Sequence, residues 1–104
     1  MSFIKVTEEN NILSIHLDRP KKRNAFHPEM ISELTNAFKE ASSNESLRAV
    51  VLRGEGKSFC SGADLEWMQS MVEYSFEENQ KDSEKLFEMF EAARNCPVPV
   101  IGQV

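Results

Sequence analysis

The run Ala49-Val50-Val51-Leu52 restricts the possible folds of this chain more than any other feature of its sequence. Four consecutive apolar residues without polar alternation are typical of a strand that is buried on both faces, as in parallel sheets. The run continues through a loop over 54–62 into a helix that the sequence predicts from Asp64. A buried strand followed by a loop and a helix indicates an α/β protein.

Two strands and a long helix are predicted before this run. Residues 3–8 and 12–17 partly alternate apolar and polar side chains, and Asn10-Asn11 separates them with a turn, which indicates a hairpin with one covered face. A helix is predicted from Pro28, because the first helical position does not need its backbone N–H. Its apolar residues recur at helical spacing and form one stripe: Met30, Ile31, Leu34, Ala37, Phe38 and Ala41.

A further helix is predicted in the last third of the chain. Ser75 and Glu78 form a capping box, so the helix begins there. Asn95 and Pro97 end it. Its first two turns are almost wholly polar, and its apolar positions follow them: Leu86, Phe87, Met89, Phe90 and Ala93.

The last predicted element is a strand over 98–104. A final strand with no helix after it leaves its sheet half covered, so we expect residues 1–104 to lack a layer or to borrow it from a partner. With 104 residues, 40% of them hydrophobic, the chain has material for one core and is too short for two. We therefore predict a single domain or part of one.

Charge and cysteine content argue against several functional classes. The chain has 12 Lys or Arg residues and 17 Asp or Glu residues, which gives a net charge of −5 and argues against a general nucleic-acid binder. The sequence contains no apolar run long enough to cross a membrane. Cys60 and Cys96 are too few for a disulfide framework. We expect two free thiols and a soluble protein of the cytoplasm.

Two nucleotide-binding motifs are suggested by Gly54-Glu55-Gly56-Lys57-Ser58 but neither is complete. A phosphate loop would need glycine in place of Val51, and a dinucleotide fingerprint would need glycine in place of Phe59. The segment is therefore interpreted as a glycine turn. The sequence likewise predicts no metal site, because the candidate ligands have no paired spacing: His16, His27, Cys60 and Cys96.

A basic segment stands out in this acidic chain. Its four cations lie within five positions: Arg19, Lys21, Lys22 and Arg23. One interpretation is a solvated loop. The other is an anchor for a multiply charged phosphate ligand, because guanidinium and ammonium groups bind phosphate oxygens well.

The segment Ser61-Gly62-Ala63-Asp64 carries the clearest chemical suggestion. It leads from a glycine-containing loop into a helix, and the first turn of a helix presents unpaired N–H groups that can hold an oxyanion. The small side chains of Gly62 and Ala63 would let a substrate carbonyl approach the backbone. The alternative is that Asp64 is only a helix cap, which its spacing alone favours.

Read together, three segments resemble the enoyl-CoA hydratase/isomerase (crotonase) family. They are Leu17–Lys21 with Asn24-Ala25, Val50–Gly54 with Gly56–Leu65, and Pro97–Ile101, and they span nearly the whole chain. The resemblance implies the N-terminal portion of a crotonase-type (ClpP/crotonase) fold, in which strand–strand–helix repeats surround a mainly parallel sheet. It also implies a homo-oligomer, because the family assembles as trimers or hexamers.

The resemblance implies an activity on acyl-CoA thioesters. In the family two backbone N–H groups hold the thioester oxygen of an enolate, and Ala63 matches one of them. The second donor and the acid–base glutamates lie beyond Val104 in the family pattern.

The implied reaction is addition of water to a 2,3-unsaturated acyl-CoA, or double-bond isomerisation, with no cofactor besides the coenzyme A of the substrate. We expect the chain alone to be inactive. The alternative is a noncatalytic coenzyme A-binding fragment, or an assembly piece that needs a C-terminal half.

Besides the Ala63 amide, the resemblance implies a set of substrate-binding residues. The adenine would rest against the backbone at Ala25, Ser61 and Leu65, and Lys21 would lie near the phosphates. The full set is Lys21, Ala25, Ser61, Gly62, Asp64, Leu65 and Trp67.

The helix that follows Asp64 has an apolar side formed by Leu65, Met68 and Val72. These residues could face either an acyl chain or the core, and we favour the core. Trp67 is the residue that we expect to influence acyl selectivity.

Overall fold

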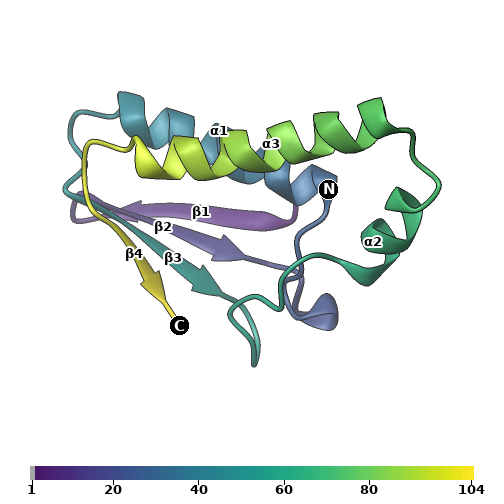
Figure 1. Cartoon of the computed structure of the whole chain (residues 1–104). Coiled ribbons are helices and arrows are strands. Elements are labelled where there is room, and N and C mark those ends of the chain that lie inside the picture. Colours follow the sequence, from purple (N-terminus) through teal and green to yellow (C-terminus); the bar gives the residue numbers. More distant parts are fainter. Residues whose placement is uncertain (1) are drawn as a thin grey trace.

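The computed structural model describes residues 2–104, which form a two-layer α/β arrangement (Figure 1). The elements, in chain order, are β1 (Ile4–Glu9), β2 (Ile12–Leu17), the 3-10 helix η1 (Pro20–Lys22), α1 (Pro28–Ser43), β3 (Ala49–Gly54), α2 (Leu65–Met71), α3 (Phe76–Arg94) and β4 (Val100–Gln103). Helices α1 and α3 lie side by side over one face of the sheet, and α2 lies beyond one end of it.

The four strands form one sheet in the order β1-β2-β3-β4. β1 and β2 pair antiparallel, whereas β2, β3 and β4 are parallel neighbours. Asn10 and Asn11 join the hairpin with φ angles of 55° and 65°, the left-handed conformation that two-residue hairpin turns require and that Asn tolerates. The predicted hairpin and the predicted parallel sheet are confirmed.

The core lies between the sheet and the helices. Each apolar residue predicted for the stripe of α1 is buried: Met30, Ile31, Leu34, Ala37, Phe38 and Ala41. They pack in one cluster with Ile15 and Leu17 from β2 and Val50 from β3. Thr35 is also buried, and its hydroxyl donates to the Ile31 carbonyl at 2.8 Å. The amphipathic pattern therefore predicted which side of α1 faces the core.

The prediction that the strand at 49–52 is buried on both faces is wrong for the described residues. Val50 is fully buried toward the helices, but Val51 and Leu52 are only half-buried. Val51 faces the side of the sheet opposite the helices, and no layer from residues 2–104 covers that side. An unbroken apolar run indicates that both faces of a strand favour burial. Residues 2–104 cover only one face of β3, so the side chains on the other face stay partly exposed.

Helix α2 presents a different side to the core from the one that we favoured. Leu65 and Val72 are 73% and 85% exposed, and Met68 is also exposed, so their assignment to the core is wrong. Trp67 is buried instead, and Met71, one turn later, packs against the same cluster. The seven residues of α2 are too few for spacing alone to fix which side turns inward.

The predicted start and end of α3 are confirmed. The Ser75 hydroxyl accepts from the Glu78 N–H and the Glu78 carboxylate accepts from the Ser75 N–H, both at 3.2 Å, which completes the capping box. Asn95 is the C-terminal cap. Among the apolar residues of the helix only Met89 is buried, whereas Phe87 and Phe90 are exposed.

Candidate functional site

Two segments that are far apart in sequence run side by side at the carboxyl end of β3. The Ser61 N–H donates to the Arg23 carbonyl at 3.0 Å, and the Phe26 N–H donates to the Gly62 carbonyl at 2.7 Å. The Asp64 N–H donates to the Phe26 carbonyl at 2.8 Å, which makes a short parallel bridge between Phe26 and Ala63. The fold therefore joins the end of the basic segment to the segment that precedes α2.

This bridge determines how the Ala63 amide points. In parallel pairing, the residue whose two neighbours make the hydrogen bonds turns its own N–H and C=O to the other side. The Ala63 N–H thus points away from Phe26, and no hydrogen-bond partner for it is found within residues 2–104. Gly62 has a φ of 101°, and a Cβ there would meet no atom within 4 Å. The Ala63 N–H is therefore an unused donor, and the residue before it in the chain borders open space.

Asp64 caps α2, as its spacing indicated. Its side chain is buried, Oδ1 accepts from the Trp67 N–H at 3.0 Å, and Oδ2 accepts from Arg19 Nη2 at 3.1 Å. The backbone hydrogen bond from Trp67, followed by the Arg19 guanidinium, lowers the pKa of Asp64 despite its burial. The carboxylate is therefore ionised at neutral pH, and each of its oxygens accepts a hydrogen bond from the protein. Such a group stabilises the fold and does not serve as a proton donor.

Arg19 is a structural member of the basic segment. Its side chain is only 13% exposed, and besides Asp64 it binds the Ala25 carbonyl through Nη1 at 2.7 Å. Its guanidinium also lies 5.7 Å from the centre of the Phe3 ring. The interpretation of the four cations as one solvated loop or one phosphate anchor is therefore wrong for Arg19, because the side chain is mostly buried and both Nη atoms donate within the protein.

Asn24 is a structural residue that the sequence reasoning missed. It is fully buried with a φ of 56°. Its Oδ1 accepts from the Arg19 N–H at 2.8 Å, and its Nδ2 donates to the carbonyls of Glu55 and Ser58 at 2.9 and 2.8 Å. Asn24 thus fastens the basic segment to the turn after β3. The signal in the sequence is an Asn at the end of a loop, since Asn adopts left-handed turns readily.

The turn after β3 needs glycine for steric reasons. A Cβ at Gly54 would lie 2.5 Å from the Phe59 carbonyl oxygen and 2.7 Å from the Phe59 Cα. Real Cβ atoms do not approach backbone atoms so closely, so only glycine fits there. The interpretation of this segment as a glycine turn is confirmed.

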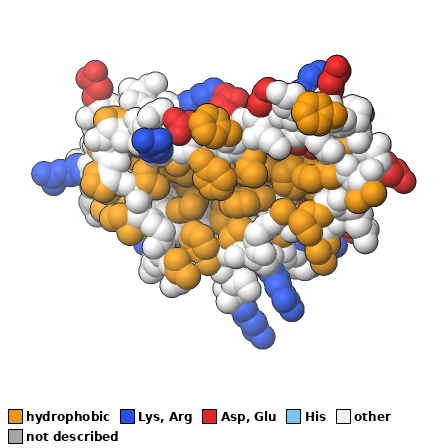
Figure 2. Space-filling view, in the orientation of Figure 1, with side chains coloured by type: hydrophobic (Ala, Val, Ile, Leu, Met, Phe, Trp, Pro, Cys, Tyr) orange, Lys and Arg blue, Asp and Glu red, His pale blue; other side chains and the backbone are white. Residues whose placement is uncertain are grey.

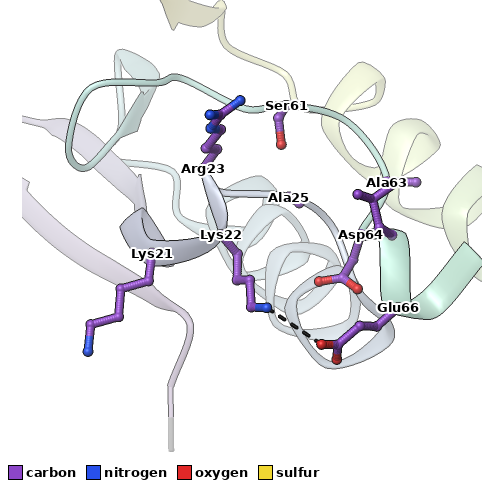
Figure 3. Close-up of a pocket in the computed structure, with 9 residues that line it drawn as sticks. Lys21, Lys22, Arg23, Ala25, Ser61, Ala63, Asp64 and Glu66 are labelled. Atoms are coloured by element: carbon purple, nitrogen blue, oxygen red, sulfur yellow. Dashed lines mark ion pairs between the residues drawn. The ribbon is translucent and has the colours of Figure 1, made fainter.

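A cavity of about 380 Å³ opens between the two paired segments and the start of α2 (Figure 3). Its lining residues are Lys21, Lys22, Arg23, Ala25, Ser61, Ala63, Asp64, Leu65 and Glu66. Six of these belong to the set predicted from the sequence. The three additional residues are Lys22, Arg23 and Glu66. The Lys22 ammonium lies 3.6 Å from the Glu66 carboxylate. Figure 3 shows Arg23 pointing along the Ser61 side of the cavity, whereas Lys21 extends away from it.

Two residues of the predicted set do not line this cavity. Gly62 lies between two lining residues of the chain but is not one of them. Trp67 is buried in the core, where its indole N–H donates to the Asp82 carboxylate at 3.1 Å. The structure therefore does not bring Trp67 together with the other predicted residues, and its influence on acyl selectivity stays a prediction.

A second cavity, of about 410 Å³, adjoins the first and shares Lys21 and Arg23 with it. Its other lining residues are Pro20, Gly56, Lys57 and Ser58. Three cations and no acidic side chain line this space, so it favours an anion of high charge. Lys57 was missed, because a single lysine after a glycine turn carries no signal without the completed phosphate-loop pattern.

Other kinds of site find no support in the part of the chain that the structure describes. No group of three or more His, Cys, Asp or Glu side chains within residues 2–104 is placed to hold a metal ion. No helix among those described is both long and apolar enough to cross a membrane. The candidate site is a pair of adjoining cavities with clustered cations and an unused backbone donor.

Known proteins share this architecture over the whole chain. A solved enoyl-CoA hydratase of Mycobacterium smegmatis superposes with a TM-score of 0.91 at 31% identity, over 100% of this chain and 40% of that one. One from Shewanella pealeana gives a TM-score of 0.92 at 32% identity, over 96% of this chain and 38% of its own. The fold is therefore confirmed as that of the crotonase proteins.

Sequence comparison agrees. The sequence model of the enoyl-CoA hydratase/isomerase family matches residues 7–104. A protein of Mycobacterium tuberculosis named probable enoyl-CoA hydratase is 36% identical over 102 residues, which are 98% of this chain and 38% of that protein. A mouse mitochondrial protein named Delta(3,5)-Delta(2,4)-dienoyl-CoA isomerase is 34% identical over 110 residues, 97% of this chain and 34% of its own.

This chain belongs to the enoyl-CoA hydratase/isomerase family. It spans about two fifths of the length of the relatives that it matches.

Proposed function

We propose that this chain supplies the coenzyme A-binding part and one oxyanion donor of an enzyme that adds water to a 2,3-unsaturated acyl-CoA. The observation that carries the proposal is the position of the unused Ala63 N–H beside a cavity that adjoins a cluster of cations. Coenzyme A joins a multiply charged phosphate end to a neutral thioester end. A cation cluster next to a backbone donor suits a ligand of that kind.

Each part of the site has a proposed role. Lys21, Arg23 and Lys57 bind phosphate oxygens, because they line the cavity that has no acidic side chain. The backbone at Ala25 and Ser61 contacts the adenine, as the family resemblance implies. No cofactor is needed besides the coenzyme A of the substrate.

The proposed chemistry depends on stabilising negative charge. Attack of water at the carbon β to the thioester carbonyl moves an electron pair onto the carbonyl oxygen. A backbone N–H that is already oriented stabilises this charge without reorganising, and one such donor contributes about 2.7–4 kcal/mol to the transition state. The Ala63 N–H is the proposed donor, and the open space beside Gly62 admits the thioester.

Acid–base groups for the reaction are not evident in the cavity. The two carboxylates that line it are Asp64, engaged by the α2 cap and by Arg19, and Glu66, which is exposed and pairs with Lys22. Neither is placed as a free proton donor. We therefore expect no turnover from residues 1–104 alone, and crotonyl-CoA hydration above a buffer blank would contradict this.

Calorimetric titration with coenzyme A tests the binding part. We expect saturable binding that weakens about tenfold or more in a Lys21→Glu, Arg23→Glu double variant, since two favourable charges become unfavourable. The matched control is a Lys81→Glu, Lys85→Glu double variant, which makes the same charge change on the exposed surface of α3. Equal affinity in the Lys21→Glu, Arg23→Glu variant and the wild type would refute the assignment of the cations.

A second candidate is a noncatalytic coenzyme A-binding fragment or an assembly piece. Two observations favour it. Both cavity carboxylates are paired with cations of this chain, and the chain spans only 38% of a relative that it matches. Binding without turnover supports the fragment. Activity that appears only when a separately produced C-terminal half is added supports the assembly piece.

A further inference from the structure

The direction of the Ala63 N–H is set by the peptide group that it shares with Gly62. This peptide group is planar and trans, so its carbonyl and its N–H point in opposite directions. The Gly62 carbonyl accepts from the Phe26 N–H at 2.7 Å, and rotation of the peptide group would break that hydrogen bond. The direction of the Ala63 N–H therefore depends on how firmly residues 62–64 are held against Phe26.

A single guanidinium group joins the two segments beside this bridge. Arg19 Nη1 donates to the Ala25 carbonyl at 2.7 Å, and Nη2 donates to Asp64 Oδ2 at 3.1 Å. Ala25 precedes Phe26 and Asp64 follows Ala63, so the guanidinium binds a residue next to each partner of the bridge. Because a guanidinium is planar and rigid, it holds its two acceptors at a fixed separation. It therefore resists movement of one segment relative to the other.

Arg19 is itself held at its backbone and at its guanidinium. Its N–H donates to Asn24 Oδ1 at 2.8 Å, and its carbonyl accepts from the N–H groups of Lys22 and Asn24, both at 2.9 Å. Its guanidinium lies 5.7 Å from the centre of the Phe3 ring, and the Phe3 N–H donates to Glu33 Oε1 of α1 at 2.8 Å. Figure 2 shows other Lys and Arg side chains extending outward at the lower edge of the view, whereas the Arg19 side chain is mostly buried. The guanidinium is thus anchored to the fold.

We propose that Arg19 is a positioning residue for the Ala63 donor. The inference rests on the proposed function, because the direction of the Ala63 N–H matters to the reaction only if that group binds an oxyanion. Arg19 lines neither cavity of the candidate site, so it acts through Asp64 and Ala25 and does not touch the ligand. Lysine in its place would keep the charge but lose the planar group, and the Gly62–Ala63 peptide group would then sample several orientations.

NMR relaxation of the backbone amides, measured on the full chain without ligand, tests this proposal. The wild-type Ala63 N–H should have an order parameter of about 0.85, the value of a rigid backbone, although no hydrogen bond to it is found within residues 2–104. In Arg19→Lys this order parameter should fall below about 0.6, or the Ala63 signal should show exchange broadening from slower motion. The matched control is Arg94→Lys, at an exposed ion pair with Glu91, which should leave Ala63 rigid.

Hydrogen exchange in the same samples separates positioning from a merely stabilising role. Loss of global stability lowers the protection of all amides that exchange by global unfolding by the same factor. Loss of positioning should lower the protection of the Phe26 and Asp64 amides, which form the bridge, about tenfold or more beyond that. The reference is the Val50 amide, which donates to the Pro99 carbonyl.

A second variant keeps the test decisive if Arg19→Lys does not fold. Asp64→Asn retains a side-chain oxygen to cap α2 but removes the carboxylate oxygen that accepts from Arg19, and we expect the same mobility at Ala63. An Ala63 amide that is mobile in the wild type overturns the proposal. One that stays as rigid in the variants as in the wild type overturns it as well. Coenzyme A is absent from these samples, so failure here is distinct from failure of the proposed function.

Discussion

Replacing Asn24 with alanine is expected to lower the free energy of unfolding by about 3–4 kcal/mol. The Asn24 side chain is fully buried and makes three hydrogen bonds, one to the Arg19 N–H and two to the carbonyls of Glu55 and Ser58. Each contributes about 1 kcal/mol net, and their backbone partners are left unpaired. Alanine also tolerates the φ of 56° less well than asparagine.

Urea unfolding followed by fluorescence measures this loss, because Trp67 is the only tryptophan and is buried in the core. Asn10→Ala is the matched control. Asn10 has the same residue type and a φ of 55°, but it is exposed in the hairpin turn, so its replacement should cost only the conformational part, about 1 kcal/mol.

The difference between the two variants isolates the hydrogen bonds of Asn24. If Asn24→Ala destabilises the chain no more than Asn10→Ala does, the buried hydrogen bonds do not hold the basic segment to the turn after β3. In that case the Asn24→Ala variant should also retain the coenzyme A affinity of the wild type, whereas the proposed arrangement predicts that the affinity falls with stability.

Three further predictions follow from the site. The pKa of Asp64 is lowered in the folded chain, so the stability that it contributes is present above its ordinary pKa of 3.8 and is lost as the pH falls through the lowered pKa. In the Asp64→Asn variant, the free energy of unfolding measured in urea should therefore depend less on pH over that acid range. Arg19→Lys should cost about 1–3 kcal/mol in thermal unfolding, since one ammonium cannot hold both the Ala25 carbonyl and the Asp64 carboxylate as a planar fork does. Gly62→Ala should cost only about 1–2 kcal/mol, because its Cβ enters open space at a positive φ; Gly54→Ala, which meets backbone at 2.5 Å, should cost more in the same urea titration.

The elements set by short-range patterns could be predicted from the sequence. The apolar stripe of α1, the Asn10-Asn11 turn and the capping box of α3 each depend on residues within a few positions of one another, and each is found in the structure. The segments of the candidate site could also be predicted, because the family resemblance lies in contiguous residues around Ala25 and Ala63.

What the sequence could not predict depends on partners far along the chain. Arg19 looked like one of four similar cations, but its carboxylate partner is 45 positions away. The inward side of α2 was also mistaken, because Trp67 is fixed by Asp82 of α3 and by the core rather than by the spacing within α2. Such contacts are known only once the fold has brought the elements together.

The bridge between Phe26 and Ala63 has a consequence for the evolution of this site. It is held by peptide groups, so replacing a side chain there need not remove the contact. Recognition by peptide groups can therefore persist while the amino acids around it change. At Phe26 and Ala63 themselves the side chains are therefore free to vary, whereas the neighbouring Arg19, Asn24 and Asp64 hold the two segments through their side chains.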